Sequence, residues 1–198
     1  QGTNTVAACV VFMNAKASKS NYRKYNIKSV SGPNDFASME EVVFRRYRRL
    51  IDEKKALPQL IVIDGGKGQL SSAVKSLKKL NIESKVTIIG IAKRLEEIYF
   101  PGDSIPLYLN KKSESLKIIQ NLRNEAHRFG IEFHKSKRVK NAMNSIFDNI
   151  DGVGEKTKNK LLKKYKSLAM IKKLSFEEIK GEIGSDKAKK ILEAFEKI

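Results

Sequence analysis

The sequence predicts an α/β layered domain followed by a small all-helical domain. Apolar strand segments without alternation, such as Leu60–Ile63, are separated by amphipathic helical segments, a pattern typical of a sheet covered on its faces. Beyond Lys140 the strand segments stop and only helical segments follow. We therefore expect a first domain over residues 1–138 and a second over 139–198, with the boundary in the basic stretch Lys135–Lys140.

The first domain is expected to begin with strands and to continue as alternating helices and strands. A continuous apolar run predicts a buried strand over Thr5–Phe12, a turn over Asn14–Ser20 follows, and alternation over Tyr22–Ile27 predicts a more exposed strand. The remaining segments, in chain order, are a helix with the apolar stripe Met39, Val42, Val43, Tyr47 and Leu50, the strand Leu60–Ile63, a helix over Ser71–Leu80, the strands Lys85–Ala92 and Glu97–Phe100, and a long helix over Leu116–Phe133.

The second domain is expected to repeat one helix–turn–helix unit. Its glycine-containing turns, 151–154 and 180–184, lie 30 residues apart from Gly154 to Gly184, which indicates an internal duplication. The predicted helices are Asn144–Ile150, Glu155–Tyr165, Leu168–Leu174, Phe176–Ile179 and Lys187–Ile198.

The turn Gly152-Val153-Gly154 resembles a helix-hairpin-helix motif and predicts binding of DNA by its phosphates. A tight Gly-x-Gly turn has no bulky side chain to keep a phosphate away, and its amides and the following helix N-terminus point at one anion. Lys156, with Lys158 and Lys160, adds positive charge. The second turn keeps Gly184 but carries Glu182 where the first has Gly152, so either Gly181 takes over by a one-residue shift or this hairpin is mainly structural.

The charge balance favours a polyanionic partner. Lys and Arg number 40 against 22 Asp and Glu, for a formal charge of +18, and neutralising phosphates releases condensed counterions. The alternative is a basic protein with no nucleic-acid role. The one cysteine, Cys9, lies in an apolar run and is interpreted as a core residue. Since no long uncharged apolar window or signal peptide is seen, we expect a cytoplasmic protein without a membrane partner.

The sharpest local signal is the strand Leu60–Ile63 followed by Asp64-Gly65-Gly66-Lys67-Gly68-Gln69. The strand delivers a carboxylate at its carboxyl end, where α/β sheets place ligands. The glycines permit close approach of a backbone or phosphate, and Lys67 would reach a phosphate. From spacing alone Asp64 is either catalytic or a cap of the turn or following helix. A phosphate-binding P-loop is excluded because its Gly-x-x-x-x-Gly-Lys-Ser/Thr pattern does not occur.

Several motifs along the chain together resemble the C-terminal half of the UvrC family, the incision subunit of bacterial nucleotide excision repair. The resemblance implies an RNase H-like nuclease domain, associated with incision 5′ to a lesion, followed by tandem helix-hairpin-helix units. It implies DNA and a UvrB–DNA pre-incision complex as partners, the latter mainly through parts of the protein outside this sequence. The matching segments are Tyr22-Arg23-Lys24-Tyr25, Gly32-Pro33-Asn34-Asp35-Phe36-Ala37, Asp64-Gly65-Gly66-Lys67-Gly68-Gln69, Ile91-Ala92-Lys93-Arg94 and Arg123-Asn124-Glu125-Ala126-His127-Arg128-Phe129.

The resemblance also implies an active site of two Asp and one His, of which Asp64 matches the second Asp and His127 the His. The first Asp belongs to a strand upstream of Gln1, so we expect a sheet without its central strand, and the activity of this chain by itself stays open. Asp64 would hold Mg²⁺ or Mn²⁺ for phosphodiester hydrolysis. His127 would either ligate the metal or move a proton, and an imidazole ligand favours Mn²⁺ somewhat.

Further residues are assigned around this site. Asp35 matches an acidic family position and is either auxiliary to catalysis or a helix cap; Asn34 and Ser38, the latter in a Ser38-x-x-Glu41 capping box, are alternative caps. Lys93 and Arg94 are expected to touch the DNA backbone, and Arg123 and Glu125 to orient the site. His134 and the Arg45–Arg49 cluster are interpreted as solvated.

Two competing hypotheses remain at this point. The chain is either a metal-dependent DNA endonuclease fragment or a non-catalytic, sequence-independent DNA-binding scaffold, which an absent first Asp would favour. A different RNase H-like enzyme, such as a resolvase or an RNA–DNA hybrid nuclease, is argued against by the two hairpins.

Overall fold

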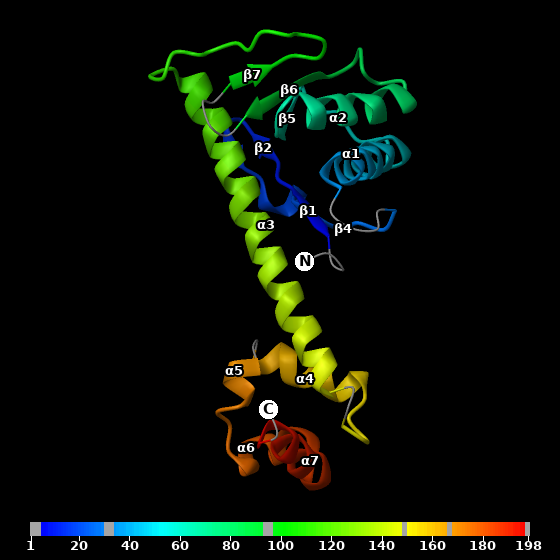
Figure 1. Cartoon of the computed structure of the whole chain (residues 1–198), viewed down its shortest axis with the longest axis vertical. Coiled ribbons are helices and arrows are strands. Elements are labelled where there is room, and N and C mark those ends of the chain that lie inside the picture. Colours follow the sequence, from blue (N-terminus) through cyan, green and yellow to red (C-terminus); the bar gives the residue numbers. More distant parts are fainter. Residues whose placement is uncertain (1–4, 30–33, 93–96, 148–149, 166–167, 197–198) are drawn as a thin grey trace. The chain divides into compact units, whose positions relative to one another are not determined.

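The computed structural model describes residues 5–29, 34–92, 97–147, 150–165 and 168–196, in two compact units, Gln1–Phe133 and His134–Ile198 (Figure 1). We call them unit 1 and unit 2 and describe each by itself. The division falls inside the helix α3 (Glu114–Phe147), slightly before the boundary expected from the sequence. The stretch Lys135–Lys140, where the boundary is expected, contains no Gly or Pro and continues the helix.

Within its described residues, unit 1 contains seven strands and the helices that connect them. Its elements are β1 (Val6–Cys9), β2 (Phe12–Met13), β3 (Lys16–Ala17), the 3₁₀ helix η1 (Lys19–Asn21), β4 (Arg23–Asn26), α1 (Asp35–Asp52), β5 (Leu60–Asp64), α2 (Lys67–Lys79), β6 (Thr87–Ala92), β7 (Glu97–Tyr99) and the first part of α3. Unit 2 holds the end of α3, then α4 (Glu155–Tyr165), α5 (Leu168–Ile171), α6 (Phe176–Ile183) and α7 (Ser185–Glu196).

The strands of unit 1 form separate ladders. β5 pairs in parallel with β6, β7 pairs antiparallel with β6 on its other side, and β1 pairs antiparallel with β4. Within the described residues, β1 and β5 each have one edge without a ladder partner. Among the described residues, the β1–β4 pair and the β5–β6–β7 sheet are therefore not joined by strand pairing.

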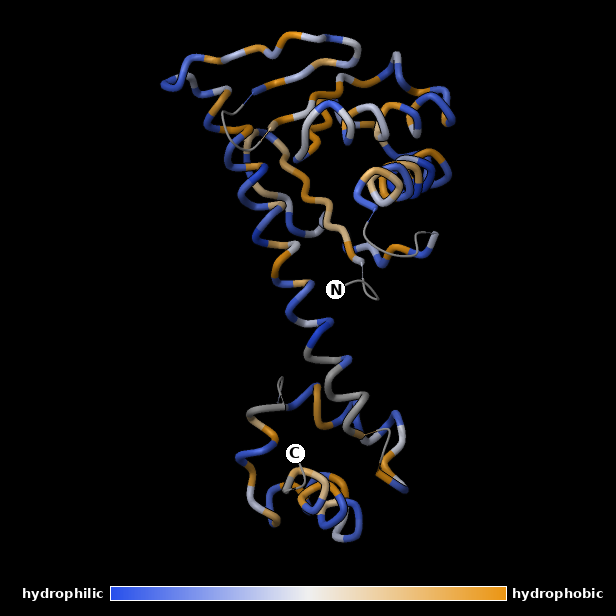
Figure 2. The backbone as a smooth tube through the Cα atoms, in the orientation of Figure 1, coloured by the Kyte–Doolittle hydropathy of each residue, from blue (hydrophilic) through white to orange (hydrophobic). Residues whose placement is uncertain are grey.

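The pair β5–β6 is covered on both faces, which confirms the expected α/β layering. On one face Ile61, Ile63 and Ile88 pack with the apolar sides of α1 and α2. On the other face Ile89 and Ile91 pack with Ile119 of α3. Successive residues of a strand point to opposite faces, so both faces of these strands must be apolar. Figure 2 shows the resulting apolar colouring along these strands.

The opening strand prediction needs correction. The apolar run Thr5–Phe12 is divided between β1 and β2, and β2 turns back through a two-residue hairpin into β3. Asn14 and Ala15 at this turn have φ of 50° and 60°, the left-handed geometry that matches the twist of paired strands. Asn is the type of residue that tolerates this region, whereas Ala gives no such signal in the sequence.

The arginine-rich face of α1 is only partly solvated. Arg48 and Arg49 are exposed and pair with Asp52 and Glu53 one turn away, as expected of a solvated face. Arg46 is buried, contrary to the expectation; burial raises the pKa of the Tyr25 hydroxyl, and the positive charge of Arg46 opposes this rise. The position of Arg46 on the apolar side of the helix, next to Tyr47, explains its burial.

Unit 2 has its own apolar core, which includes Phe147, Leu161 and Ile191. The turn predicted over residues 180–184 is mostly wrong, because α6 continues through Gly181 to Ile183 and only Gly184 has a positive φ, of 87°. A Ser175–Glu178 capping box fixes the start of α6 and stabilises its first turn. This stabilisation explains why the helix continues through Gly181.

Across both units, no helix in the described ranges has the length and apolar character needed to cross a bilayer.

Candidate active site and nucleic-acid interface

Asp64 is the last residue of β5 and is exposed, at the carboxyl end of a parallel strand pair. It shares a strand face with Val62, and Val62 packs in the cluster of Ile89, Ile91 and Ile119. Alternation along the strand therefore turns Asp64 toward the sheet face that α3 covers. The backbone just after it is fixed, because the Gly65 amide donates to the carbonyls of both Ile63 (2.9 Å) and Ile91 (3.1 Å).

Close approaches surround two glycines near Asp64, Gly65 and Gly90. A Cβ at Gly65 would lie 1.6 Å from Oε1 of Gln69, whose side chain folds back over the loop. On the neighbouring strand, a Cβ at Gly90 would lie 2.9 Å from the Gly65 carbonyl oxygen. The loop that follows Asp64 is therefore closely packed against β6 as well as against its own helix.

Asp35 belongs to the same neighbourhood through Phe36. A Cβ at Gly68, in the first turn of α2, would lie 2.5 Å from the ring of Phe36 in the first turn of α1. The two helix starts are therefore in contact, one beginning at Asp35 and the other three residues after Asp64. Sequence reasoning assigned no role to Phe36, although an apolar residue in the exposed first turn of a helix can indicate a contact with another element.

Asp35 does not cap α1, so one of its two predicted roles is removed. The cap is Asn34, whose Oδ1 accepts from the Ala37 amide at 3.0 Å. The Ser38–Glu41 capping box is also wrong, because Ser38 lies inside the helix and its hydroxyl donates to the Asn34 carbonyl. An exposed Asp35 remains at the first helical position, where the helix dipole favours a carboxylate.

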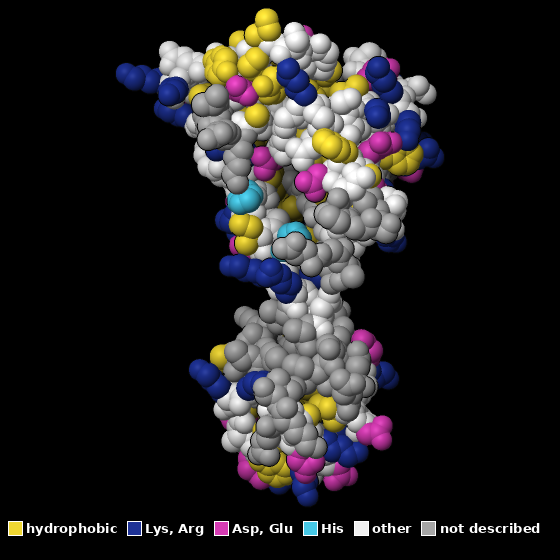
Figure 3. Space-filling model, in the orientation of Figure 1, with side chains coloured by type: hydrophobic (Ala, Val, Ile, Leu, Met, Phe, Trp, Pro, Cys, Tyr) yellow, Lys and Arg dark blue, Asp and Glu magenta, His cyan; other side chains and the backbone are white. Residues whose placement is uncertain are grey.

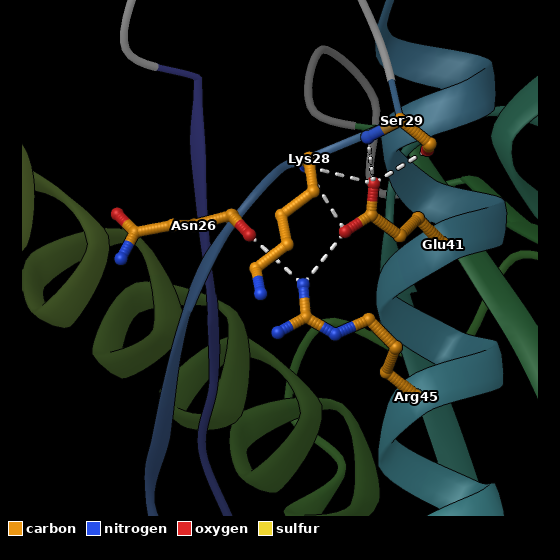
Figure 4. Close-up of polar contacts among 5 residues, drawn as sticks. All are labelled: Asn26, Lys28, Ser29, Glu41 and Arg45. Atoms are coloured by element: carbon orange, nitrogen blue, oxygen red, sulfur yellow. Dashed lines mark hydrogen bonds and ion pairs between the residues drawn. The ribbon is translucent and has the colours of Figure 1, made fainter.

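Glu41 clamps the segment that leads into α1 (Figure 4). Its carboxylate accepts from the Lys28 and Ser29 amides, the Ser29 hydroxyl and the Arg45 guanidinium at 2.6–3.1 Å. Partial burial raises the pKa of Glu41, but these hydrogen bonds from Ser29, Lys28 and Arg45 outweigh it and lower the pKa to about 2. Sequence reasoning treated Glu41 as half of a capping box and missed this role.

His127 is exposed on α3, between two segments that pack on the two ladders. Ile119 contacts the β6–β7 side, and a Cβ at Gly130 would lie 3.8 Å from Cβ of Ala8 in β1. The residues around His127 are held by Tyr22, whose hydroxyl donates to Glu125 at 3.1 Å and whose ring meets Phe129 edge-on at 5.1 Å. Burial and the Glu125 carboxylate raise the pKa of Tyr22 to about 12, so this hydroxyl stays a donor.

Glu125 has a supporting position that agrees with its predicted orienting role. Besides the Tyr22 hydroxyl it accepts two hydrogen bonds at 2.7 Å from Arg128, which lower the pKa of the carboxyl. The side chain of Arg123 lies near Asn124 Oδ1 at 3.2 Å. Glu125 therefore ties α3 to β4 in the turn that carries His127.

Among the described residues, the predicted catalytic residues of unit 1 have no side-chain partner, unlike most other carboxylates of the unit. Asp35, Asp64 and His127 make no side-chain hydrogen bond or ion pair within the part of the chain that the structure describes. Most carboxylates of the unit are engaged, for example Glu40 with Lys79 and Glu132 with Arg128. Basic side chains are abundant in a chain with a charge of +18, yet Asp35 and Asp64 pair with none that is described. They are therefore available to bind a metal cation.

The described residues do not by themselves complete a metal site. No three His, Cys, Asp or Glu side chains among them are grouped as metal ligands. Asp64 and His127 are therefore not part of a three-residue ligand group among these residues. Figure 3 shows acidic and histidine side chains reaching the surface on one face of the molecule.

Of the residues of unit 1 that are predicted to contact DNA, Lys67 is described, and its ammonium group already contacts other parts of the unit. Its Nζ donates to the Ser104 carbonyl at 2.5 Å and lies 5.0 Å from the centre of the Tyr99 ring. Lys67 would have to leave these contacts to reach a phosphate. Lys93 and Arg94 lie outside the described residues.

The first glycine turn of unit 2 leads directly into a helix. Gly152 has a φ of 84°, Val153 is buried in the core, and α4 begins directly after Gly154. Lys156 is exposed beside the turn, whereas Lys158 is buried and is not available there. Sequence reasoning missed Lys190 of α7, whose Nζ donates to the Asp151 carbonyl at 3.0 Å and adds a cation at the turn.

The second turn is built differently. Glu182 lies at the end of α6, where its carboxylate bonds to Lys164 and its carbonyl accepts from Lys160 at 2.5 Å. The Lys164 ammonium lowers the pKa of Glu182. Gly181 is helical and does not take over from Gly152, so of the two alternatives the structural role of Glu182 is favoured.

The fold and the site together define an RNase H-like α/β domain followed by an all-helical region. Residues 1–131 match the family described as the UvrC RNase H endonuclease domain. The chain belongs to this UvrC family.

Named relatives agree over the whole chain. It is similar to the UvrABC system protein C of Flavobacterium psychrophilum (63% identity over 198 residues, 100% of this chain and 33% of the relative), of Christiangramia forsetii (65% over 188 residues, 95% and 32%) and of Porphyromonas gingivalis (55% over 197 residues, 100% and 33%). The chain thus spans about a third of the length of these relatives.

Proposed function

We propose that this chain is the part of a DNA-repair endonuclease that hydrolyses one phosphodiester 5′ to a lesion in bacterial nucleotide excision repair. Asp64 and His127 are the catalytic pair, Asp35 is auxiliary, and unit 2 holds DNA through its phosphates. The partners are DNA and a UvrB–DNA pre-incision complex, the latter reached mainly through other parts of the protein. Family membership and the position of Asp64 support this proposal.

One observation carries the catalytic assignment. Asp64 is exposed at the carboxyl end of β5, faces the α3 side of the sheet and has no partner among the described residues. A side chain that serves only as a cap would accept hydrogen bonds from nearby backbone amides, as the Asn34 amide oxygen and the Glu178 carboxylate do.

The side chains fit a divalent cation in kind. The Asp64 carboxylate is a hard oxygen ligand suited to Mg²⁺ or Mn²⁺, and the His127 imidazole would add a nitrogen ligand or carry a proton. When bound, the cation supplies an acidified water and neutralises charge on the phosphate. Asp35, fixed by the Phe36–Gly68 contact, would orient water or a hydrated cation from the side of α1.

Unit 2 is proposed to bind DNA without reading its sequence. The Gly152 turn offers backbone amides at the start of α4, with Lys156 and Lys190 beside it. Gly184 at the start of α7 is a second, weaker candidate because the neighbouring Glu182 repels phosphate.

The test is an incision assay on lesion-bearing duplex with Mg²⁺ or Mn²⁺, with the full-length protein that contains this chain. Asp64→Ala is expected to lower the incision rate on the order of a hundredfold or more while leaving DNA affinity unchanged. Glu83→Ala, which changes an exposed acid on the α2–β6 turn, is the matched control and should incise normally. Normal 5′ incision by Asp64→Ala would refute the catalytic assignment.

A second candidate is a DNA-binding scaffold without chemistry. The lack of a three-residue metal group in the described residues favours it for this chain alone. The same assay run with this chain alone tests the scaffold, since incision that Asp64→Ala abolishes would refute it and a scaffold incises with neither residue at this position.

A further inference from the structure

An exposed apolar patch lies on the β7–α3 loop, residues 100–113. Ile105 is 79% exposed and Tyr108 58% exposed, and Phe100 and Leu107 are also largely open to solvent. Large apolar side chains concentrated in one short loop are unusual on a protein surface without a partner. Figure 3 shows apolar side chains gathered over this loop, with Lys and Arg side chains next to them.

The loop is held in one conformation, so its exposure is not the result of a loose segment. Leu107 and Ile98 exchange two backbone hydrogen bonds of 2.8 and 3.0 Å, which extend the edge of β7. The Tyr108 hydroxyl donates to Glu97 at 2.8 Å, which fixes the ring while leaving its face open. Pro106 restricts the backbone next to Ile105. A fixed apolar surface loses little conformational entropy on binding.

The loop is connected directly to the segment that carries Asp64. Lys67, in the first turn of α2, donates to the Ser104 carbonyl, next to Ile105. A groove of about 600 Å³ runs between α2 and residues 100–103 of the loop, and Lys67 and Asp103 both line it. Ile105 and Tyr108 do not line this groove, so they belong to the outer side of the loop.

The charge around the patch identifies the chemistry of the partner. Lys111 and Lys112 follow Tyr108 and are exposed, and neither is paired within the described ranges. Of two nearby acids, Glu97 accepts from the Tyr99 and Tyr108 hydroxyls, and Asp103 lines the groove on the α2 side of the loop. An apolar and aromatic tip beside unpaired lysines suits a ligand that has both flat apolar faces and phosphates.

We propose that the β7–α3 loop contacts unstacked bases of DNA, with Ile105 and Tyr108 against the base faces and Lys111 and Lys112 against the phosphates. The proposal rests on the proposed function, because it takes the DNA at Asp64 to continue onto this loop. Base faces stack on aromatic side chains whatever their sequence, and apolar side chains enter unstacked steps. The loop therefore favours DNA that is locally unpaired over a fully paired duplex.

The test compares binding of the chain to a duplex with a short unpaired bubble and to the same duplex fully paired, by fluorescence anisotropy. The double variant Ile105→Ser/Tyr108→Ser is expected to bind the bubble about tenfold more weakly and to bind the paired duplex unchanged. Its affinity should keep the same dependence on salt, because apolar contacts release no counterions. Lys111→Ser/Lys112→Ser should instead reduce the salt slope by about 2 for either DNA.

Two further variants keep the interpretation specific. Tyr108→Phe retains the ring and loses only the hydrogen bond to Glu97, so it should bind the bubble nearly as the unchanged chain does. Ile51→Ser removes an exposed isoleucine on α1 and should change neither affinity. Because Ile105 is so exposed, its variants should unfold at the same urea concentration as the unchanged chain.

The outcomes separate this proposal from the proposed function. The role of the loop is overturned if the wild-type chain binds the bubble and the paired duplex equally well. It is also overturned if Ile105→Ser/Tyr108→Ser still binds the bubble more tightly than the paired duplex. Incision that requires Asp64 would then still support the endonuclease. Conversely, loop-dependent bubble binding together with normal incision by Asp64→Ala would support the loop and refute the catalytic assignment.

Discussion

Replacing Glu41 by Gln tests whether one carboxylate holds the entry into α1. The side chain keeps its size but loses the charge that attracts the Arg45 guanidinium and the Lys28 and Ser29 amides. A fall of the pKa from 4.5 to about 2 corresponds to about 3.4 kcal/mol at 1.36 kcal/mol for each unit. Arg45 is 37% exposed, so solvent screens part of this energy, and we expect a loss of about 2 kcal/mol in the free energy of unfolding.

The pH dependence distinguishes charge from packing. Because folding lowers the pKa of Glu41, its contribution is complete above about pH 4.5 and is lost as the pH falls toward 2. The difference between the unchanged chain and Glu41→Gln should therefore be largest near pH 6 and should be reduced by about half at pH 3. A difference that stays constant between these pH values would refute the electrostatic reasoning.

Urea unfolding followed by tyrosine fluorescence measures this change in unit 1. The chain has no Trp and 6 Tyr, of which only Tyr165 lies in unit 2. Glu40→Gln is the matched control, since the neighbouring Glu40 forms one surface ion pair with Lys79 and should cost less than about 1 kcal/mol.

Three further substitutions test the backbone features around the two candidate sites. Gly90→Ala places a Cβ 2.9 Å from the Gly65 carbonyl oxygen and should cost about 1–3 kcal/mol in urea unfolding of unit 1; unchanged stability would show that the loop moves freely. Gly152→Ala puts a side chain at a φ of 84° and should lower the melting temperature of the helical signal and weaken DNA binding, at a cost of about 1–2 kcal/mol. Ser175→Ala removes the capping box with Glu178 and should lower the free energy of unfolding of unit 2 by about 1 kcal/mol, measured by circular dichroism. Unlike Gly152→Ala, this variant should retain its affinity for DNA.

The layered part of the fold could be predicted because apolar periodicity fixes which faces are buried. The stripe that includes Val43, Tyr47 and Leu50 predicted α1, and the run Leu60–Ile63 predicted β5 and the place of Asp64 at its end. Both signals are local, and each element is long or apolar enough that packing agrees with the pattern.

Features that depend on contacts between distant segments could not be predicted. The burial of Arg46 depends on Tyr25, the clamp by Glu41 depends on Lys28 and Ser29, and the position of Lys67 depends on the Ser104 carbonyl. None of these partners is fixed by sequence spacing. The family motif identified Asp64 and His127, whereas the engagement of Glu182 by Lys164 follows only from the packing of α4 against α6.

The hydrogen bonds of the Gly65 amide bear on which residues of this domain can be substituted without moving Asp64. It donates to carbonyls of both β5 and β6, so the direction of the chain after Asp64 is set by main-chain atoms rather than by any side chain. Apolar residues of either strand can be exchanged for others of similar volume without moving the carboxylate. Repacking of the interior and tuning of the proposed chemistry are therefore nearly independent problems for this domain, and a designer could pursue each without undoing the other.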